Sequence, residues 1–110
     1  MSDEPLMNAV TKYYTVVTTG TITNSDWMPT YLADVPALVA RHGGRYLAKT
    51  DDIDRLQGGG DMPSAVALLE WPSKEAAEAF FTDSDYRPYL EARLAGTSGF
   101  NYLFPAAHEA

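Results

Sequence analysis

The sequence contains no cysteine, only two histidines, and 8 lysines and arginines against 15 aspartates and glutamates. The absence of cysteine excludes disulfides, thiolate catalysis and cysteine-ligated metals, and it is typical of proteins of a reducing cytoplasm. The net charge of −7 predicts a surface that repels phosphate backbones and anionic lipids, so we expect no nucleic acid and no membrane as a partner. No apolar run approaches the roughly 20 residues of a transmembrane helix. The acidic first ten residues do not resemble a signal peptide, and we expect a cytoplasmic protein.

The remaining composition is that of an ordinary globular domain, with 45% hydrophobic and 21% charged residues over 110 positions. This length suffices for one domain with one modest core. No repeat, low-complexity block or linker divides the chain. We therefore predict a disordered tail over residues 1–10, a single domain over residues 11–105, and a second tail over residues 106–110.

Alternating patterns along the chain predict four strands and two helical regions. β-branched and aromatic residues predict strands over residues 12–19, 44–49, 65–71 and 100–105. Residues 51–64, with three consecutive glycines, predict a flexible connection, which can carry a short extension of a hairpin around residues 53–56.

Both helical regions contain signals for a start and for an interruption. In the first, apolar residues recur at helical spacing from Trp27 to His42. Ser25 or Asp26 is the expected N-terminal cap, and Pro36 is expected to kink or split the helix. The second region starts after the cap residue Ser73 and is interrupted at "TDSD", residues 82–85, where Asp83 or Ser84 is expected to cap a second piece.

The order β-α-β-β-α-β predicts an α+β, ferredoxin-like fold, with an antiparallel sheet and both helices on one face. The other face of such a sheet is polar in a monomer, but the strands here have apolar residues on both faces. A large exposed apolar patch is a liability. We therefore predict a homodimer in which two sheets pack face to face across a two-fold axis.

Three segments occur in an order and at a spacing that match a known family. They are "ARHGGRYLAK", "ALLEWPSKEAAEAFF" and "DSDYRPYLEARLAG". They resemble the DUF1330 family, a group of small dimeric α+β-barrel proteins of undefined function, over nearly the whole ordered chain. The matching residues are the Gly-Gly-Arg at Gly43, Gly44 and Arg45, the Glu-Trp-Pro-Ser at residues 70–73 (where the family has Phe for Trp), and Tyr31, Tyr86 and Arg93.

Two positions depart from the family pattern. The family commonly has a Glu-Gly pair in the second hairpin strand, where Gln57 and Gly58 stand here, and its usual tryptophan in the second helix is Phe80. If that glutamate serves a shared chemistry, this protein lacks it. The wider superfamily includes cofactor-free oxygenases, haem enzymes, lactone-forming or isomerising enzymes and proteins with no known activity. The resemblance therefore implies a fold and not a reaction.

Two residues are candidate catalytic groups. His42, the one histidine inside the predicted domain, can act as a general acid or base. It can equally stabilise the end of the preceding helix with no catalytic role. Arg93 can bind a substrate carboxylate through two hydrogen bonds, or it can pair with a structural carboxylate such as Glu91.

Further residues are candidate ligand contacts: Tyr14, Trp27, Tyr31, Arg45, Glu70 and Tyr86. Aromatic residues at helical spacing usually form a core, but tyrosine hydroxyls that converge on a cavity would suit an aromatic or polyketide-like ligand. Arg45 and Glu70 can instead form a structural ion pair at a strand end. The pair Gly43–Gly44 follows a helix, which favours a helix stop over a phosphate-binding loop.

The sequence predicts no metal site and no cofactor, since one interior histidine and no cysteine cannot make a usual zinc site and no nucleophile-elbow motif is present. Two functions stay open. One is a small-molecule-binding, cofactor-independent enzyme that acts by proton transfer or oxygenation on an aromatic or polyketide-like substrate. The other is a non-catalytic dimeric binding or accessory protein.

Overall fold

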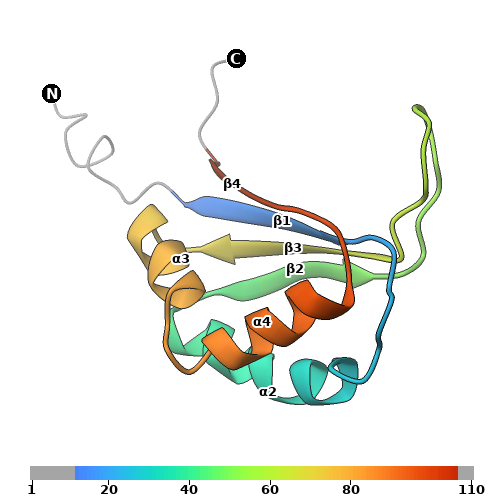
Figure 1. Cartoon of the computed structure of the whole chain (residues 1–110). Helices are drawn as coiled ribbons and strands as arrows, with labels where there is room; N and C mark the ends of the chain where they lie inside the picture. The colour runs from blue at the N-terminus through green and yellow to red at the C-terminus, as the bar shows by residue number, and fades with distance from the viewer. Residues whose placement is uncertain (1–11, 107–110) are drawn as a thin grey trace, which may run out of the picture.

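Strands and helices alternate along the chain in the predicted order (Figure 1). The computed structural model describes residues 12–106. Its elements are β1 (Tyr13–Thr19), α2 (Met28–Arg41), β2 (Arg45–Thr50), β3 (Ala65–Trp71), α3 (Lys74–Phe81), α4 (Arg87–Gly96) and β4 (Asn101–Pro105). The second helical region is divided into α3 and α4, as the "TDSD" interruption predicts.

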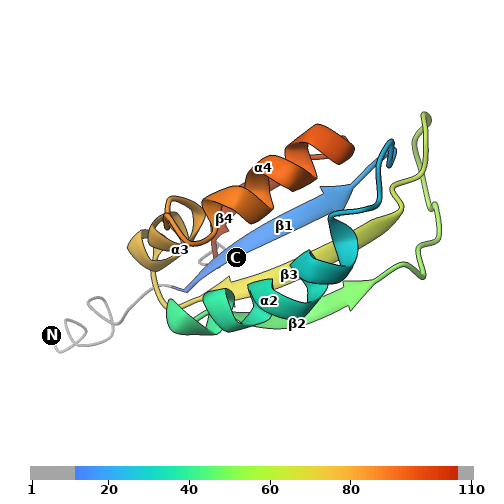
Figure 2. The same ribbon diagram turned by 60° about the horizontal axis from the view of Figure 1, so that its bottom comes forward.

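The four strands form one antiparallel sheet in the order β2-β3-β1-β4. In the central pair, Tyr13 of β1 lies opposite Trp71 of β3, and Thr19 lies opposite Ala65. All three described helices cover the same face of this sheet (Figures 1 and 2). The architecture is therefore the predicted α+β, ferredoxin-like fold.

Helix α2 begins and continues differently from its prediction. Its N-cap residue is Trp27, which forms no side-chain cap hydrogen bond, so the predicted cap at Ser25 or Asp26 was wrong. The predicted split at Pro36 was also wrong, because α2 is one helix from Met28 to Arg41. Buried side chains on both sides of Pro36, Val35 and Val39 among them, hold the helix against the sheet and offset the lost backbone hydrogen bond.

The end of α2 is the predicted glycine stop. Gly43 has a φ of +79°, in the left-handed region that favours glycine, and its N–H donates to the carbonyl of Ala40. Gly44 passes so close to the Trp71 ring that a Cβ atom there would lie 2.6 Å from the ring. The pair thus ends the helix and lets the chain turn under Trp71 into β2.

Helices α3 and α4 start in different ways. The Ser73 hydroxyl caps α3 by accepting a hydrogen bond from the Ala76 N–H, as predicted. Helix α4 has Tyr86 as its N-cap and no side-chain cap, so the predicted cap at Asp83 or Ser84 was wrong. Asp83 instead accepts a hydrogen bond from the Asp85 N–H within the turn.

The core lies between the helices and the sheet. Its buried residues are Val35, Leu38, Val39, Leu69, Trp71, Ala77, Phe80 and Tyr86. Residues of β3 that face the core alternate with residues that face away from it. Two aromatic residues lie outside this core: Tyr14 lies on the other face of the sheet, where its ring contacts Phe104, and Phe81 is 43% exposed.

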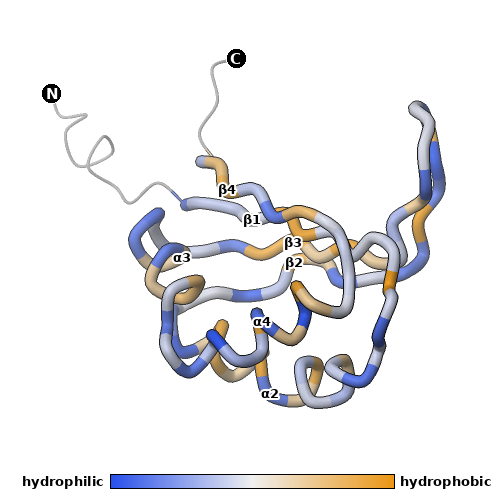
Figure 3. Tube along the Cα trace, in the orientation of Figure 1, coloured by the Kyte–Doolittle hydropathy of each residue, from blue (hydrophilic) through white to orange (hydrophobic). Residues whose placement is uncertain are grey.

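The face of the sheet away from the helices has no cover among residues 12–106 (Figure 3). We call it the open face. The register places on it Tyr14, Val16, Val66, Leu68, Tyr102 and Phe104. Tyr102 is 60% exposed and stacks on Phe100, which is 51% exposed. The structure thus agrees with the expectation that neither face is polar.

The connection over residues 51–64 extends away from the sheet (Figures 1 and 2). It contains no strand, so the hairpin extension considered for residues 53–56 is not formed. Leu56 is 98% exposed, and a Cβ atom on Gly59 would meet nothing within 4 Å. Within the part of the chain that the structure describes, no helix is long and apolar enough to cross a membrane.

Candidate active site

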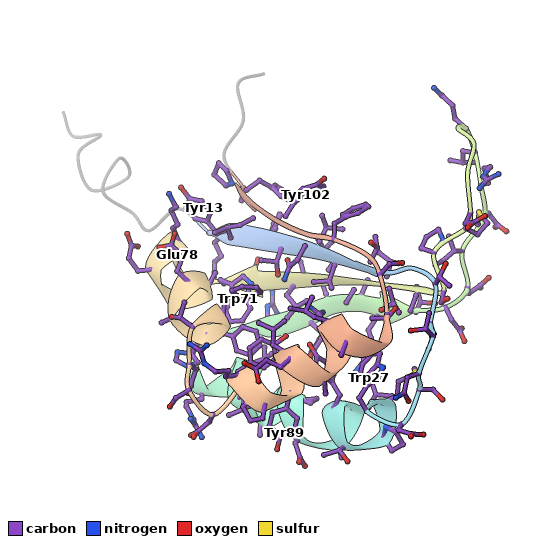
Figure 4. All side chains as sticks on the ribbon, in the orientation of Figure 1. Tyr13, Trp27, Trp71, Glu78, Tyr89 and Tyr102 are labelled. Atoms are coloured by element: carbon purple, nitrogen blue, oxygen red, sulfur yellow. The ribbon has the colours of Figure 1, made fainter. Side chains whose placement is uncertain are left out.

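A cavity of about 830 Å³ lies between the helices and the covered face of the sheet. Its floor is formed by side chains of β1 and β3, including Val17, Ala67 and Leu69, and its walls come from the helices. Figure 4 shows Trp71 between α3 and the sheet, and Trp27 where the start of α2 meets α4. Most of the lining is apolar, which is typical of small-molecule sites with a few placed polar groups.

Four polar side chains from three elements converge on this cavity. They are Tyr31 of α2, Tyr46 of β2, Tyr86 at the N-cap of α4, and Arg93 within α4. The Tyr31 and Tyr86 hydroxyls lie 2.6 Å apart and share a hydrogen bond. The Arg93 guanidinium lies over the Tyr31 ring, 5.6 Å from its centre. We call this group the tyrosine–arginine cluster.

The helical repeat explains how the cluster is assembled. Tyr86 and Arg93 are seven residues apart, two turns of α4, and therefore lie on one side of it. Trp27 and Tyr31 are four residues apart on α2, and their rings meet edge to face at 5.4 Å. Neighbouring turns of two helices thus bring aromatic rings and a cation to the same place above the sheet.

Burial sets the protonation of the tyrosines. Desolvation raises the pKa of Tyr46 to about 12 and raises that of Tyr86 well above its usual value. The nearby charge of Arg93 lowers both pKa values but is outweighed. Both hydroxyls are therefore neutral near pH 7 and can donate hydrogen bonds.

The cavity has few groups that could remove a proton. Asp51 and Glu78 line it, but both residues are exposed at its rim. Trp27 Nε1 is buried and has no hydrogen-bond partner among residues 12–106, so the indole adds a further donor to the region. The arrangement is suited to stabilising negative charge on oxygen. In the same described residues, no group of three or more His, Asp or Glu side chains could hold a metal ion.

His42 lies outside the cavity lining. Its Nε2 atom is 2.8 Å from Asp83 Oδ2, and its ring packs edge-on against Phe80. Arg41 also contacts Asp83, at 3.2 Å. The hydrogen bond from His42 is the main reason that the pKa of Asp83 is lowered. These contacts join the end of α2 to the turn between α3 and α4.

Three other candidate residues lie on the open face or at its edge. Arg45 Nε donates to Glu70 Oε1 at 2.9 Å, which is the structural ion pair that the sequence offered as an alternative. Lys12 lies 3.8 Å from the same oxygen. Tyr14 lies opposite Glu70 in the register. None of these residues lines the cavity.

The structure therefore brings together four of the eight candidate residues: Trp27, Tyr31, Tyr86 and Arg93. Tyr46 and Lys49 also line the cavity, and no sequence pattern had selected them. Lys49 Nζ lies 4.8 Å from the centre of the Tyr46 ring. The two residues are three apart on a strand with a register shift after Tyr46, and regular alternation would place them on opposite faces.

The fold and the cavity define a class: a small α+β protein with a ferredoxin-like sheet and an apolar cavity under its helices. The model of one family, described as a domain of unknown function (DUF1330), matches residues 12–104. The chain belongs to the DUF1330 family, as its three sequence segments indicate. Among curated protein sequences, none matches this chain.

Two solved structures are similar to this one in fold. RPA0582, a protein of unknown function from Rhodopseudomonas palustris, has a TM-score of 0.74 at 15% identity, covering 91% of this chain and 85% of its own. SnoaB, a cofactor-independent oxygenase from Streptomyces nogalater, has a TM-score of 0.55 at 18% identity, covering 89% of this chain and 93% of its own. At these identities the likeness concerns the fold alone.

Proposed function

We propose that this protein binds a small aromatic or polyketide-like molecule in the cavity and acts on it as a cofactor-independent enzyme, by proton transfer or oxygenation. The observation that carries the proposal is the cavity itself, with apolar walls and one cluster of hydrogen-bond donors. Aromatic rings such as Trp27 and Phe80 suit a flat ligand. SnoaB, which has a similar fold, is a cofactor-independent oxygenase and supports the analogy.

The proposed chemistry follows from what the cluster can stabilise. Both reactions begin when the substrate loses a proton, to water or to a rim carboxylate such as Glu78, which leaves negative charge on a substrate oxygen. In the oxygenation, this anion then gives electrons to molecular oxygen and is oxidised. The hydroxyls of Tyr31 or Tyr86 and the guanidinium of Arg93 can stabilise that charge. Arg93 is the proposed catalytic group, and Trp27, Tyr31 and Tyr86 are the proposed ligand contacts.

A second candidate, a non-catalytic dimeric binding or accessory protein, is favoured by one specific observation. His42, the general base that the sequence offered, hydrogen-bonds to Asp83 outside the cavity lining. The carboxylates that do line the cavity, Asp51 and Glu78, are exposed at its rim. A site without an interior base can bind a ligand without transforming it.

We further propose that the open face forms a homodimer, with Tyr102 and Leu68 of one protomer packed on the sheet of the other. The apolar side chains that the register places on the open face, Tyr102 (60% exposed) among them, would be removed from water in such an interface. A cytoplasmic location stays a prediction, which cell fractionation can test.

The binding proposal can be tested with a substitution that fills the cavity with a larger side chain. Replacing Ala67, on its floor, by phenylalanine should abolish the binding of aromatic ligands, measured by quenching of the fluorescence of Trp27 and Trp71. The matched control is Ala33→Phe on the exposed side of α2, which should bind as the wild type does. Binding that survives in a folded Ala67→Phe protein would contradict the proposal.

Two substitutions separate the enzyme from the binding protein. Arg93→Ala should lower turnover or binding with little change in thermal stability if Arg93 contacts the substrate. His42→Ala should lower thermal stability, because it removes the hydrogen bond between His42 and Asp83. Ligand binding should be unchanged, because this hydrogen bond lies outside the cavity. Turnover assayed with the compounds that quench fluorescence, followed by mass spectrometry, decides between the two functions.

A further inference from the structure

The tyrosine–arginine cluster has more hydrogen-bond donors than acceptors. Tyr31 and Tyr86 have one hydroxyl hydrogen each, and the 2.6 Å contact uses one of the two. Among residues 12–106, neither hydroxyl has another hydrogen-bond partner. One hydroxyl hydrogen of the pair is therefore free to donate a hydrogen bond to a ligand.

Arg93 adds a positive charge with no counter-charge of its own. Its side chain is half-buried against the cavity, and its guanidinium has up to five N–H donors. No carboxylate among the described residues forms an ion pair with it, and Glu91, considered as a partner from the sequence, does not. A cation that is partly removed from water favours an anionic partner.

The remaining charges around the cavity do not supply that partner. Lys49 is a second cation in the lining, while Asp51 and Glu78 are exposed at the rim. The protein as a whole has a net charge of −7 and repels anions at long range. Selection of an anion must therefore come from contacts inside the cavity.

We propose that the cavity selects the ionised form of a weak acid: a flat, mostly apolar molecule with one negatively charged oxygen held by Arg93 and the free hydroxyl hydrogen of the Tyr31–Tyr86 pair. The charged oxygen belongs to a carboxylate, an enolate or a phenolate. The inference rests on the proposed function, because it names the class of ligand for the same cavity.

Burial raises the pKa of a bound phenol, whereas the tyrosine–arginine cluster lowers it. The direction of the pKa change on binding therefore tests the inference. Burial disfavours an anion and is the main reason that the pKa of the Tyr46 hydroxyl is raised to about 12, although the charge of Arg93 opposes the shift. A phenol that entered the cavity without help would likewise become a weaker acid. A bound phenol that becomes a stronger acid would owe the change to Arg93 and the hydroxyl pair.

The experiment uses phenols whose absorption changes on ionisation, 7-hydroxycoumarin and 2-naphthol, together with their O-methyl ethers, which cannot ionise. The absorption of each phenol is titrated with pH, free and bound to the full-length protein. We expect binding to lower the pKa of the phenol by about one unit or more, which equals tenfold or greater preference for the anion. The affinity of the ethers, which cannot ionise, should not show this dependence on pH.

Three variants identify the source of the shift. Arg93→Gln should lose the lowered pKa of the bound phenol. Arg93→Lys retains the charge and should retain part of the shift. The matched control is Arg87→Gln, which removes the same charge from an exposed position on the same helix and should leave the shift unchanged.

The outcomes separate this inference from the proposed function. If phenols and ethers both bind but the pKa of the bound phenol is unchanged or raised, the anion inference is wrong and the small-molecule proposal stands. The same holds if Arg93→Gln, still folded by circular dichroism, keeps the full shift. If neither phenols nor ethers bind, the proposed function fails, and this inference fails with it.

Discussion

Removing both hydroxyls of the Tyr31–Tyr86 pair should cost less stability than the two single removals added together. In Tyr31→Phe, the Tyr86 hydroxyl loses its partner in a residue that is only 1% exposed. A buried polar group without a partner costs about 1–3 kcal/mol. Tyr86→Phe should cost less, about 0.5–1.5 kcal/mol, because Tyr31 is not fully buried and can reach water.

The double variant should be less destabilised than the sum of the two single variants, since it leaves no unpaired hydroxyl. We expect a coupling free energy of about 1 kcal/mol or more between the two sites. The free energies of unfolding are measured by urea denaturation at pH 7, with tryptophan fluorescence as the signal. A loss of about 1 kcal/mol corresponds to a decrease in Tm of about 4–8 °C for a domain of this size. Strictly additive effects of the two substitutions would refute the reasoning.

Further predictions concern the open face, the α2 terminus and the glycine stop. Leu68→Asp should convert the dimer to a monomer in sedimentation, and a wild-type protein that is monomeric at micromolar concentration would contradict the proposed dimer. Because the pKa of Asp83 is lowered in the folded state, its stabilising effect exists above the ordinary carboxyl pKa and is lost as the pH falls below about 4. Asp83→Asn should thus lower Tm at pH 7 but not near pH 2, and an equal loss at both pH values would argue against the ion pair. Gly44→Ala should cost about 1–3 kcal/mol of unfolding free energy, because its Cβ atom would lie 2.6 Å from the Trp71 ring. An unchanged urea midpoint would contradict that packing.

The sequence predicted the fold well because its signals are local. Strand runs rich in β-branched residues, the Ser73 cap and the glycine after α2 each act over a few residues, and all were confirmed. The expected split at Pro36 was wrong because that outcome depends on tertiary packing. Packing of Val35 and Val39 on the sheet keeps α2 continuous, and a sequence pattern does not reveal that energy.

The candidate site was harder to predict because it depends on which face of each strand is covered. The strand "YYTVVTT" is apolar on both sides, so alternation alone did not show that Tyr14 would face away from the helices. Tyr46 was missed for a related reason, since the register shift after it, which brings Tyr46 and Lys49 to the same side, does not show in the sequence. The partner of His42 is Asp83, 41 residues later, and such a contact follows only from the fold.

The central claim is that the cavity under the helices is the ligand site, and backbone amide NMR tests it most directly. On titration with 7-hydroxycoumarin, the account predicts chemical-shift changes at Tyr31, Tyr46, Ala67 and Arg93, which line the cavity. Shift changes that concentrate on open-face residues such as Leu68, with the cavity residues unchanged, would contradict the account.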